Sequence, residues 1–344
     1  MDDVRSWLAS VMADAPTHAD PRDLTGLDEA FERRLVREAG AHGWLALEGE
    51  ALAAFNFEVA RADAPLVDTA VTLIGGLLAV HRPHLLGPVV AGEVTACIAY
   101  TEAQAGSDLA AIEAVADETD RGWELRGRKV LVTGAHKADW CVTLAASNFD
   151  VPPRDGMSMF LVDMHAPGVR VERRPTMNGW DLGDVYFEDA PAQLLGVRDG
   201  GWRQLVTAVA AERSGMFWLG FARHVLDLLV DHVRGHDDVL ARDTLGRLAA
   251  EWSAAEQLCW RVVREPDDAV LPSMAKIVTT ELLQDLAQTA SELAGTDGVR
   301  WAPLFGDPAG RFGYEYLERV HGTISVGANE VQRDTIARFG LGLR

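Results

Sequence analysis

Cysteine is scarce in this sequence: Cys97, Cys141 and Cys259 are the only three in 344 residues. They lie far apart, and no two of them form the CxxC pair that is common in structural zinc sites and redox dithiols. Small domains that depend on disulfide bonds carry cysteine at much higher density. The sequence therefore excludes a disulfide framework and a cysteine-ligated zinc site.

Basic residues are also in short supply. Lys and Arg number 32 against 52 Asp and Glu, which gives a formal net charge of -20 and a pI of about 4.8. A protein that binds a phosphate backbone or an anionic membrane needs a clustered basic face, and none stands out here. The charged run at 231–238 is typical of a solvated helix end. We therefore exclude nucleic acid and anionic membranes as main partners.

Long apolar runs and export signals are lacking as well. The longest nearly apolar stretch, Leu66–Val80, contains Asp68 and is too short to span a bilayer. The N-terminal sequence MDDVRSWLAS opens with acid instead of the basic and apolar segments of a signal peptide. No internal repeat, low-complexity linker or G-K-[ST] phosphate loop is present. These absences predict a soluble cytoplasmic protein.

What the sequence does have is a clear change of hydrophobic period along the chain. Up to about residue 92, apolar residues such as Leu27, Phe31 and Leu35 recur every three or four positions, which predicts helices. Between about residues 94 and 191 the period is two, with many β-branched residues, which predicts an antiparallel barrel or sandwich. Helical spacing returns from about residue 202. The fold class is therefore α+β, with an N-terminal helical domain at 1–92, a β domain at 93–192 and a C-terminal helical domain at 193–344.

The individual elements follow from the same periods and from the glycine, proline and asparagine clusters between them. The candidate strands are Val94–Tyr100, Trp123–Leu125, Lys129–Thr133, Trp140–Ala145, Ser158–Val162, Val169–Arg173 and Asp184–Glu188. The candidate helices of the last region are Ala208–Val233, Asp243–Val263, Pro272–Leu293 and Asn329–Phe339.

Three blocks of sequence, taken together, resemble the acyl-CoA dehydrogenase family. The first is Tyr100–Asp108 (YTEAQAGSD) followed by Gly127–Thr133 (GRKVLVT), and the second is Glu212-Arg213 followed by Arg242–Gly246 (RDTLG). The third is Gly327–Arg333 (GANEVQR). Their order and the helix–strand–helix layout fit the family over nearly the whole chain. The resemblance implies two helical domains and a β domain around one FAD.

The resemblance assigns the first block to the cofactor. Tyr100 opens this block, and Thr101 is implied to contact the flavin ring, while Gly106 and Ser107 are implied to approach cofactor and substrate. A glycine suits such a close approach because it has no Cβ. Without the other blocks, the A-G-S-D segment can equally be interpreted as an ordinary turn beside a strand.

The second part of that block is implied to lie against the flavin itself. Thr133 corresponds to a family residue near flavin N5. Leu131 stands where many members have a tryptophan packed on the flavin face. This departure does not exclude binding, because a leucine side chain can still cover an apolar ring.

Further cofactor contacts are implied across a subunit interface. Arg242, with Leu245 and Gly246, resembles an R-x-x-F-G element that touches the neighbouring subunit's FAD pyrophosphate, for which the planar fork of arginine is suited. Gly295 lies at the position where the family has a glycine-rich turn near the partner's cofactor, although a helix cap explains this glycine equally well. The third block, through Gly327, Ala328 and Glu330, is assigned to the cofactor side. A homodimer or homotetramer is therefore expected.

The catalytic base is the least regular feature of the sequence. Many family members place a glutamate just before the glycine of the third block, where this chain has Val326, which cannot take a proton. The isovaleryl- and long-chain types instead use a glutamate before the arginine that begins the first long C-terminal helix. Glu212 stands there and is the candidate base, with Arg213 helping to hold the pocket. Glu330 is a second, weaker candidate for the base. Glu212 also has a non-catalytic explanation, because the helix dipole alone favours a glutamate in the first turn of a helix.

These features predict an FAD-dependent dehydrogenase that oxidises an acyl-CoA or an acyl carrier protein (acyl-ACP) thioester. The short N-terminal domain, Val326 and Leu131 suggest a specialised member, similar to those of secondary metabolism that make polyketide extender units. Two alternatives stay open: a base-less partner subunit of a hetero-oligomer, and a flavin-dependent hydroxylase on the same fold. The sequence does not identify the acyl chain or the electron acceptor.

Two other signals do not indicate a site. His81 and His84 are three residues apart, but Pro83 between them predicts a helix end, and no third metal ligand is evident. The terminal GLGLR is no dinucleotide fingerprint, since no helix can follow it. No metal site is expected.

Overall fold

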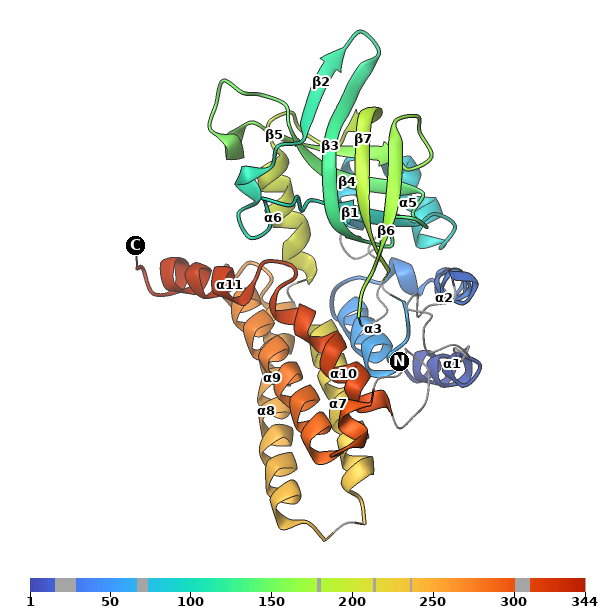
Figure 1. Cartoon of the computed structure of the whole chain (residues 1–344), viewed down its shortest axis with the longest axis vertical. Coiled ribbons are helices and arrows are strands. Elements are labelled where there is room, and N and C mark those ends of the chain that lie inside the picture. The colour runs from blue at the N-terminus through green and yellow to red at the C-terminus, as the bar shows by residue number, and fades with distance from the viewer. Residues whose placement is uncertain are drawn as a thin grey trace.

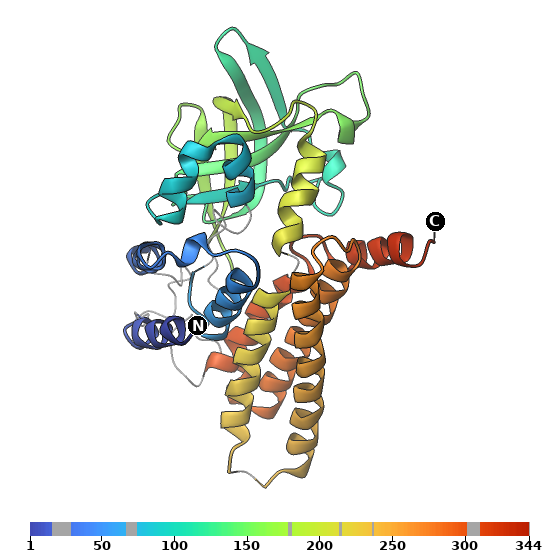
Figure 2. The same cartoon turned by 180° about the vertical axis from the view of Figure 1, so that it is seen from behind.

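The computed structural model describes residues 1–15, 29–66, 74–177, 181–212, 215–235, 237–300 and 310–343. A β domain forms one end of the molecule and a bundle of long helices forms the other (Figure 1). The N-terminal helices lie beside these two parts, and one helix, α6, runs from the β domain toward the bundle (Figures 1 and 2). No helix in the described ranges is both long and apolar enough to cross a membrane.

The N-terminal helices form two groups, one with a core of its own and one packed against the β domain. They are α1 (Asp2–Ala13), α2 (Glu29–Ala41), α3 (Gly49–Arg61), α4 (Gly75–His81) and α5 (Pro83–Val90). Helices α1 to α3 share a core that contains Leu8, Leu35 and Phe55, whereas α4 and α5 bury side chains against the β domain. Helix α3 also packs closely on the bundle, where a Cβ at Gly220 would lie 2.4 Å from the Phe57 carbonyl oxygen.

The β domain is a seven-stranded sheet with mostly antiparallel pairing. Its strands are β1 (Ala96–Ala99), β2 (Val115–Thr119), β3 (Gly122–Thr133), β4 (Trp140–Ala146), β5 (Met157–Asp163), β6 (Val169–Pro175) and β7 (Asp181–Leu194). The order is β1-β4-β2-β3-β7-β5, with β6 paired to β7 beside this path, and the additional β4–β5 pairing closes the sheet on itself. Only the β1–β4 and β2–β4 pairs are parallel among the described strands. Of the two expected forms, an antiparallel barrel or sandwich, the closed sheet is the barrel, and the parallel pairs at β4 are a departure from the prediction.

Two strand predictions need correction. Trp123–Leu125 and Lys129–Thr133 are one continuous strand, β3, because Gly127 does not form a turn. A Cβ on Gly127 would lie 2.7 Å from the Ala114 Cβ, so this glycine allows close strand contact instead. Strand β2 was not predicted, and its polar, half-exposed sequence VADET explains why.

Helix α6 (Gly201–Glu212) packs against the β domain. The bundle consists of α7 (Met216–Val233), α8 (Val239–Arg264), α9 (Leu271–Leu293), α10 (Arg311–Arg319) and α11 (Asn329–Thr335), followed by a π-helical turn at Ile336–Gly340. The predicted helix Ala208–Val233 is wrong as a single element, since α6 and α7 are separate. Gly215 stands before α7 with φ of 78°, a left-handed conformation that ends a helix. The buried bundle core contains Leu219, Leu248 and Leu283, and also Trp218 and Trp252.

Candidate cofactor and substrate site

The first block forms a loop beside strand β3. It leaves β1 at Tyr100, and the carbonyl oxygen of Thr101 accepts a hydrogen bond of 2.9 Å from the backbone N–H of Val130. This bond joins the two halves of the predicted flavin contact, which are 29 residues apart in sequence. Thr101 is half-buried, while Gly106 and Ser107 are exposed farther along the loop.

Strand β3 is interrupted beside this loop by a bulge. Its pairing with β7 shifts register between Lys129 and Val132, and Leu131 within the bulge has φ of 57°. A left-handed conformation is disfavoured for a leucine, and bulges commonly serve to redirect a side chain. The side chain of Leu131 is 59% exposed, and Thr133 is exposed as well. The bulge therefore presents an apolar side chain and a hydroxyl side by side at one surface.

A buried ion pair is formed by the residues next to the Thr101–Val130 hydrogen bond. The Nζ of Lys129 is 2.7 Å from Oε1 of Glu102, and the two side chains are 0% and 4% exposed. Burial alone would raise the pKa of Glu102, but the Lys129 charge and hydrogen bonds from Lys129 and backbone N–H groups lower it below the ordinary value. Both residues lie within the blocks that indicated a cofactor, but sequence reasoning missed their pairing.

The third block forms a tight turn before α11. Val326 and Gly327 have φ of 54° and 83°, and the side-chain N–H of Gln332 donates to the Gly327 carbonyl at 3.1 Å. Asn329 is buried and accepts from Lys276 Nζ at 2.6 Å. The turn therefore has a fixed shape, set by side chains from α9 and α11.

Two polar groups near this turn differ in their surroundings. The Oγ of Ser325 is buried and has no hydrogen-bond partner among the residues that the structure describes. Glu330, in contrast, is 79% exposed and pairs with Arg333 at 3.5 Å. Glu330 thus lies in solvent and not in the dry pocket that a catalytic base needs, so it is poorly suited to be the base. The buried hydroxyl of Ser325 is the group that lacks a partner.

For the candidate base Glu212, the structure describes the position of the backbone in its helix. Glu212 is the last residue of α6, so the prediction that it lies at the start of a helix is wrong, and the helix dipole does not explain it. Arg213 lies outside the described residues. Helix α6 runs from the β domain to the end of the bundle at which α11 begins (Figures 1 and 2). The backbone at Glu212 is thus on the side of the bundle that faces the β domain, as a base between the two parts requires.

The residues assigned to a partner's cofactor lie elsewhere. Helix α8 begins at the end of the bundle farthest from the β domain, and α9 ends there (Figure 1). Arg242 and Gly246 are exposed in the first turns of α8, and Gly295 follows α9 with φ of 58°. Within one chain these residues are therefore not brought together with Thr101, Leu131 or Thr133.

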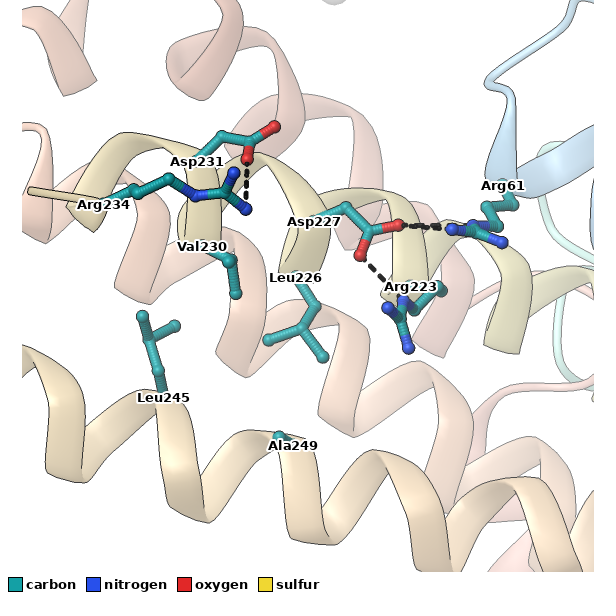
Figure 3. A pocket seen from close by; sticks show the side chains of 9 residues that line it. All are labelled: Arg61, Arg223, Leu226, Asp227, Val230, Asp231, Arg234, Leu245 and Ala249. Atoms are coloured by element: carbon teal, nitrogen blue, oxygen red, sulfur yellow. Dashed lines mark hydrogen bonds and ion pairs between the residues drawn. The ribbon is translucent and has the colours of Figure 1, made fainter.

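The same region contains a pocket of about 460 Å³ between α7 and α8 (Figure 3). Each of its charged groups has a partner within the pocket: Asp227 accepts from Arg61 at 3.1 Å and from Arg223 at 2.8 Å, and Asp231 pairs with Arg234 at 3.2 Å. The pocket also contains the half-buried Leu245. Because its charges are internally paired and it lies on the bundle, we do not assign the reaction to it.

A second buried polar cluster joins the N-terminal helices to the bundle. Asp63, His224 and Glu315 come close enough to hold a metal ion. The position is already taken by two guanidinium groups: Arg319 lies 2.8 Å from both carboxylates, and Arg311 lies 2.7 Å from Glu315. The cluster is therefore an ion-pair network that connects α3, α7 and α10.

This network makes stability depend on pH. Burial alone would raise the pKa values of Asp63 and Glu315, but Arg311 and Arg319 lower them below their ordinary values. Burial lowers the pKa of His321 from 6.5 to about 4. In each case the unfolded chain binds protons at a higher pH than the folded chain does, so stability falls as the pH falls.

We therefore expect the melting temperature to decrease between pH 6.5 and about 4, the window set by His321. Thermal unfolding followed by circular dichroism across this range measures the effect. The His321→Gln variant should show a smaller decrease within the same window, since it removes the titrating ring. A wild-type melting temperature that stays constant across the window would contradict the assignment.

Comparison with known proteins agrees with this architecture. The model of the acyl-CoA dehydrogenase middle domain matches residues 97–190, and the model of the acyl-CoA dehydrogenase C-terminal domain matches residues 199–341. Acyl-CoA dehydrogenase FadE29 of Mycobacterium tuberculosis is 29% identical over 308 residues, which cover 83% of this chain and 79% of that protein.

Solved structures share the whole fold. The structure titled Tcur3481-Tcur3483 steroid ACAD superposes with a TM-score of 0.88 at 22% identity and covers 100% of this chain and 97% of that one. The ChsE4-ChsE5 complex from Mycobacterium tuberculosis gives a TM-score of 0.87 at 21% identity, with 100% and 96% covered. At these identities the likeness concerns the fold, while the two sequence models together span both the β domain and the bundle. The chain belongs to the acyl-CoA dehydrogenase family.

Proposed function

We propose that this chain is an FAD-dependent dehydrogenase that oxidises an acyl thioester between its α- and β-carbons. Membership of the family supports both the cofactor and the reaction class. The observation that supports the site most directly is the hydrogen bond of 2.9 Å between Val130 N–H and the Thr101 carbonyl. It holds the loop of the first block against the bulge that carries Leu131 and Thr133.

The described residues fit a flavin at this surface. An isoalloxazine ring needs an apolar contact on its face and hydrogen-bond partners along its edge. Leu131 offers an exposed apolar side chain, which is otherwise unfavourable in water, and Thr101 and Thr133 offer hydroxyl groups nearby. A bound FAD would supply the acceptor for the hydride from the substrate β-carbon.

The protein's own contribution is to remove the α-proton. Glu212 takes this proton on its carboxylate, and exclusion of water raises the pKa of such a carboxylate toward the working pH. Arg213 helps to fix the position of the base. Val326 lines the place where many relatives carry their base and keeps it apolar.

Ser325 is our candidate for a substrate contact. Its buried hydroxyl has no partner in the described part of the chain, and an unpaired buried hydroxyl is costly. The adjoining Val326–Gly327 turn belongs to the block assigned to the site. A thioester carbonyl is an acceptor that would satisfy this hydroxyl.

Assembly with a second chain completes the cofactor site in this proposal. Arg242 lies at the end of the bundle away from the β domain, so it can reach a pyrophosphate only in a neighbouring subunit. Its side chain is 54% exposed and pairs with Asp237 at 2.9 Å, a surface contact that is readily exchanged for a phosphate. A homodimer or homotetramer provides this arrangement, and Leu245, Gly246 and Gly295 accompany Arg242 at the interface.

Replacing Arg242 by alanine is expected to weaken FAD binding about tenfold, because one charge-assisted contact to the pyrophosphate is lost. The matched control is Arg247→Ala on the same helix, whose arginine is 53% exposed and pairs with Glu251 at 2.7 Å. Fluorescence titration of FAD into both apoproteins measures the difference. Equal FAD affinity in the two variants would remove Arg242 from the site.

A partner subunit in a hetero-oligomer is the second candidate. Val326 favours it, because the usual base is missing there, and the similar ChsE4-ChsE5 structure is a complex of two named chains. Sedimentation combined with the molar ratio of FAD to protein distinguishes a self-sufficient dehydrogenase from a partner subunit. One FAD per chain in a homo-oligomer supports the dehydrogenase, whereas a colourless protein that gains FAD only with a second homologue supports the partner subunit.

The substrate class is proposed as an acyl-CoA or acyl-ACP thioester of a specialised pathway, such as polyketide extender-unit formation. The similar structure titled a steroid ACAD adds steroid-derived thioesters to the substrates worth testing. The division into domains 1–92, 93–192 and 193–344 is part of the same proposal. Anaerobic titration of the FAD-loaded protein with such thioesters should bleach the flavin. Failure of every thioester class to bleach a bound flavin would contradict dehydrogenase function.

A further inference from the structure

The buried pair of Glu102 and Lys129 ties together three separate segments. Lys129 Nζ donates to Glu102 Oε1 at 2.7 Å and approaches the Tyr100 carbonyl at 3.4 Å. The same carboxylate accepts backbone N–H groups of Glu113 at 2.7 Å and Ala114 at 3.0 Å. The loop after β1, the start of β2 and the middle of β3 therefore meet at one carboxylate.

The pair directly adjoins the residues proposed to contact the flavin. Thr101 is the residue before Glu102, and its carbonyl bonds to Val130, the residue after Lys129. Leu131 follows in the left-handed conformation of the bulge, with φ of 57°. Both sides of the proposed flavin contact are thus attached within two residues of the ion pair.

Stability alone is a weak reason for such a pair. Removing two charges from water is costly, and apolar side chains of similar volume often stabilise a fold equally well. A carboxylate with four directed donors does something that an apolar pair cannot do, because each donor fixes one segment in distance and direction. The fourth donor is Gln104 Nε2, at 2.8 Å on the same loop.

We propose that Glu102 and Lys129 are positioning residues for the cofactor. The pair holds Thr101 at a fixed distance from Leu131 and Thr133, so that the apolar and hydroxyl contacts meet the flavin together. In this role the two side chains act through their neighbours and not by direct contact, since they are 0% and 4% exposed. This inference rests on the proposed function, because it takes those three residues as the flavin contact.

The test is the double variant Glu102→Gln/Lys129→Met, which removes both charges and leaves no unpaired buried ion. We expect it to fold with a melting temperature close to that of the wild type, to bind FAD about tenfold more weakly, and to shift the visible spectrum of the bound flavin. The matched control is Arg128→Met/Asp184→Asn, which removes the ion pair between β3 and β7 at the residue before Lys129 and the second pair of Asp184 with Arg174. The control should bind FAD with wild-type affinity and spectrum.

A second variant covers the case in which the double variant does not fold. Glu102→Asp keeps the charge beside Lys129 but withdraws the carboxylate by one methylene, so it should fold and still weaken FAD binding. Hydrogen exchange of the apoprotein gives an independent reading, in which the amides of 101–104 and of Val130 should exchange faster in both Glu102 variants than in the control. Wild-type protein that binds no FAD would defeat the proposed function. Wild-type protein that binds FAD, with Glu102 variants unchanged in affinity, spectrum and exchange, would overturn the positioning role alone.

Discussion

Replacing Glu212 by glutamine is expected to leave FAD bound and to abolish bleaching of the flavin by substrate. Glutamine has nearly the same shape as glutamate but cannot take the α-proton. The loss of a positioned general base typically lowers a rate by about 10²–10⁴-fold. Anaerobic stopped-flow absorbance after mixing the FAD-loaded variant with an acyl thioester measures this rate.

The matched control for this experiment is Glu330→Gln. Glu330 was the weaker candidate base, and its 79% exposure removes the dry environment that such a base needs. This variant should bleach at a rate close to that of the wild type. Bleaching that is undiminished in Glu212→Gln and lost in Glu330→Gln would reverse the assignment of the base.

Replacing Arg319 by methionine is expected to destabilise the fold by about 3–5 kcal/mol, the usual cost of breaking a buried ion pair from one side. The guanidinium is 1% exposed and lies 2.8 Å from both Asp63 and Glu315. Methionine would keep contact with the Phe221 ring that Arg319 now covers, but two carboxylates would lose a partner. Urea unfolding followed by tryptophan fluorescence measures the loss.

The control is an arginine that is paired but exposed. Arg338 lies 2.8 Å from Asp334 on the C-terminal helical turn and is 61% exposed. Exposed pairs contribute about 0–1 kcal/mol, so Arg338→Met should change stability little. Similar losses in the two variants would show that the buried network has no special role in joining α3 to the bundle.

The β domain was largely predictable because alternation of apolar residues marks a half-buried strand directly. The errors arise where a local signal has two meanings. Gly127 was left between two separate predicted strands, yet it lies inside β3, where only a missing Cβ allows contact with Ala114. Gly215 was included in the amphipathic run Ala208–Val233, although a Cβ there would come 2.9 Å from Cys259 Sγ. The role of each glycine depends on the residue that faces it in the fold, and the spacing of residues along the sequence does not reveal that contact.

The candidate site was predictable only in part for the same reason. The blocks that contain Thr101 and Thr133 were identified from sequence, and the structure joins them through Val130. The pairing of Glu102 with Lys129, 27 residues away, and of Asp63 with Arg319, 256 residues away, had no sequence signal. A charged residue looks solvated in sequence until the fold buries it against a partner.

The most direct measurement of the central claim is the visible absorption spectrum of the purified protein after FAD loading and gel filtration. The account predicts a flavin spectrum that elutes with the protein in a homo-oligomeric peak and that is bleached anaerobically by an acyl thioester. Protein that elutes without colour after loading, alone and without a second homologue, would contradict a self-sufficient FAD-dependent dehydrogenase.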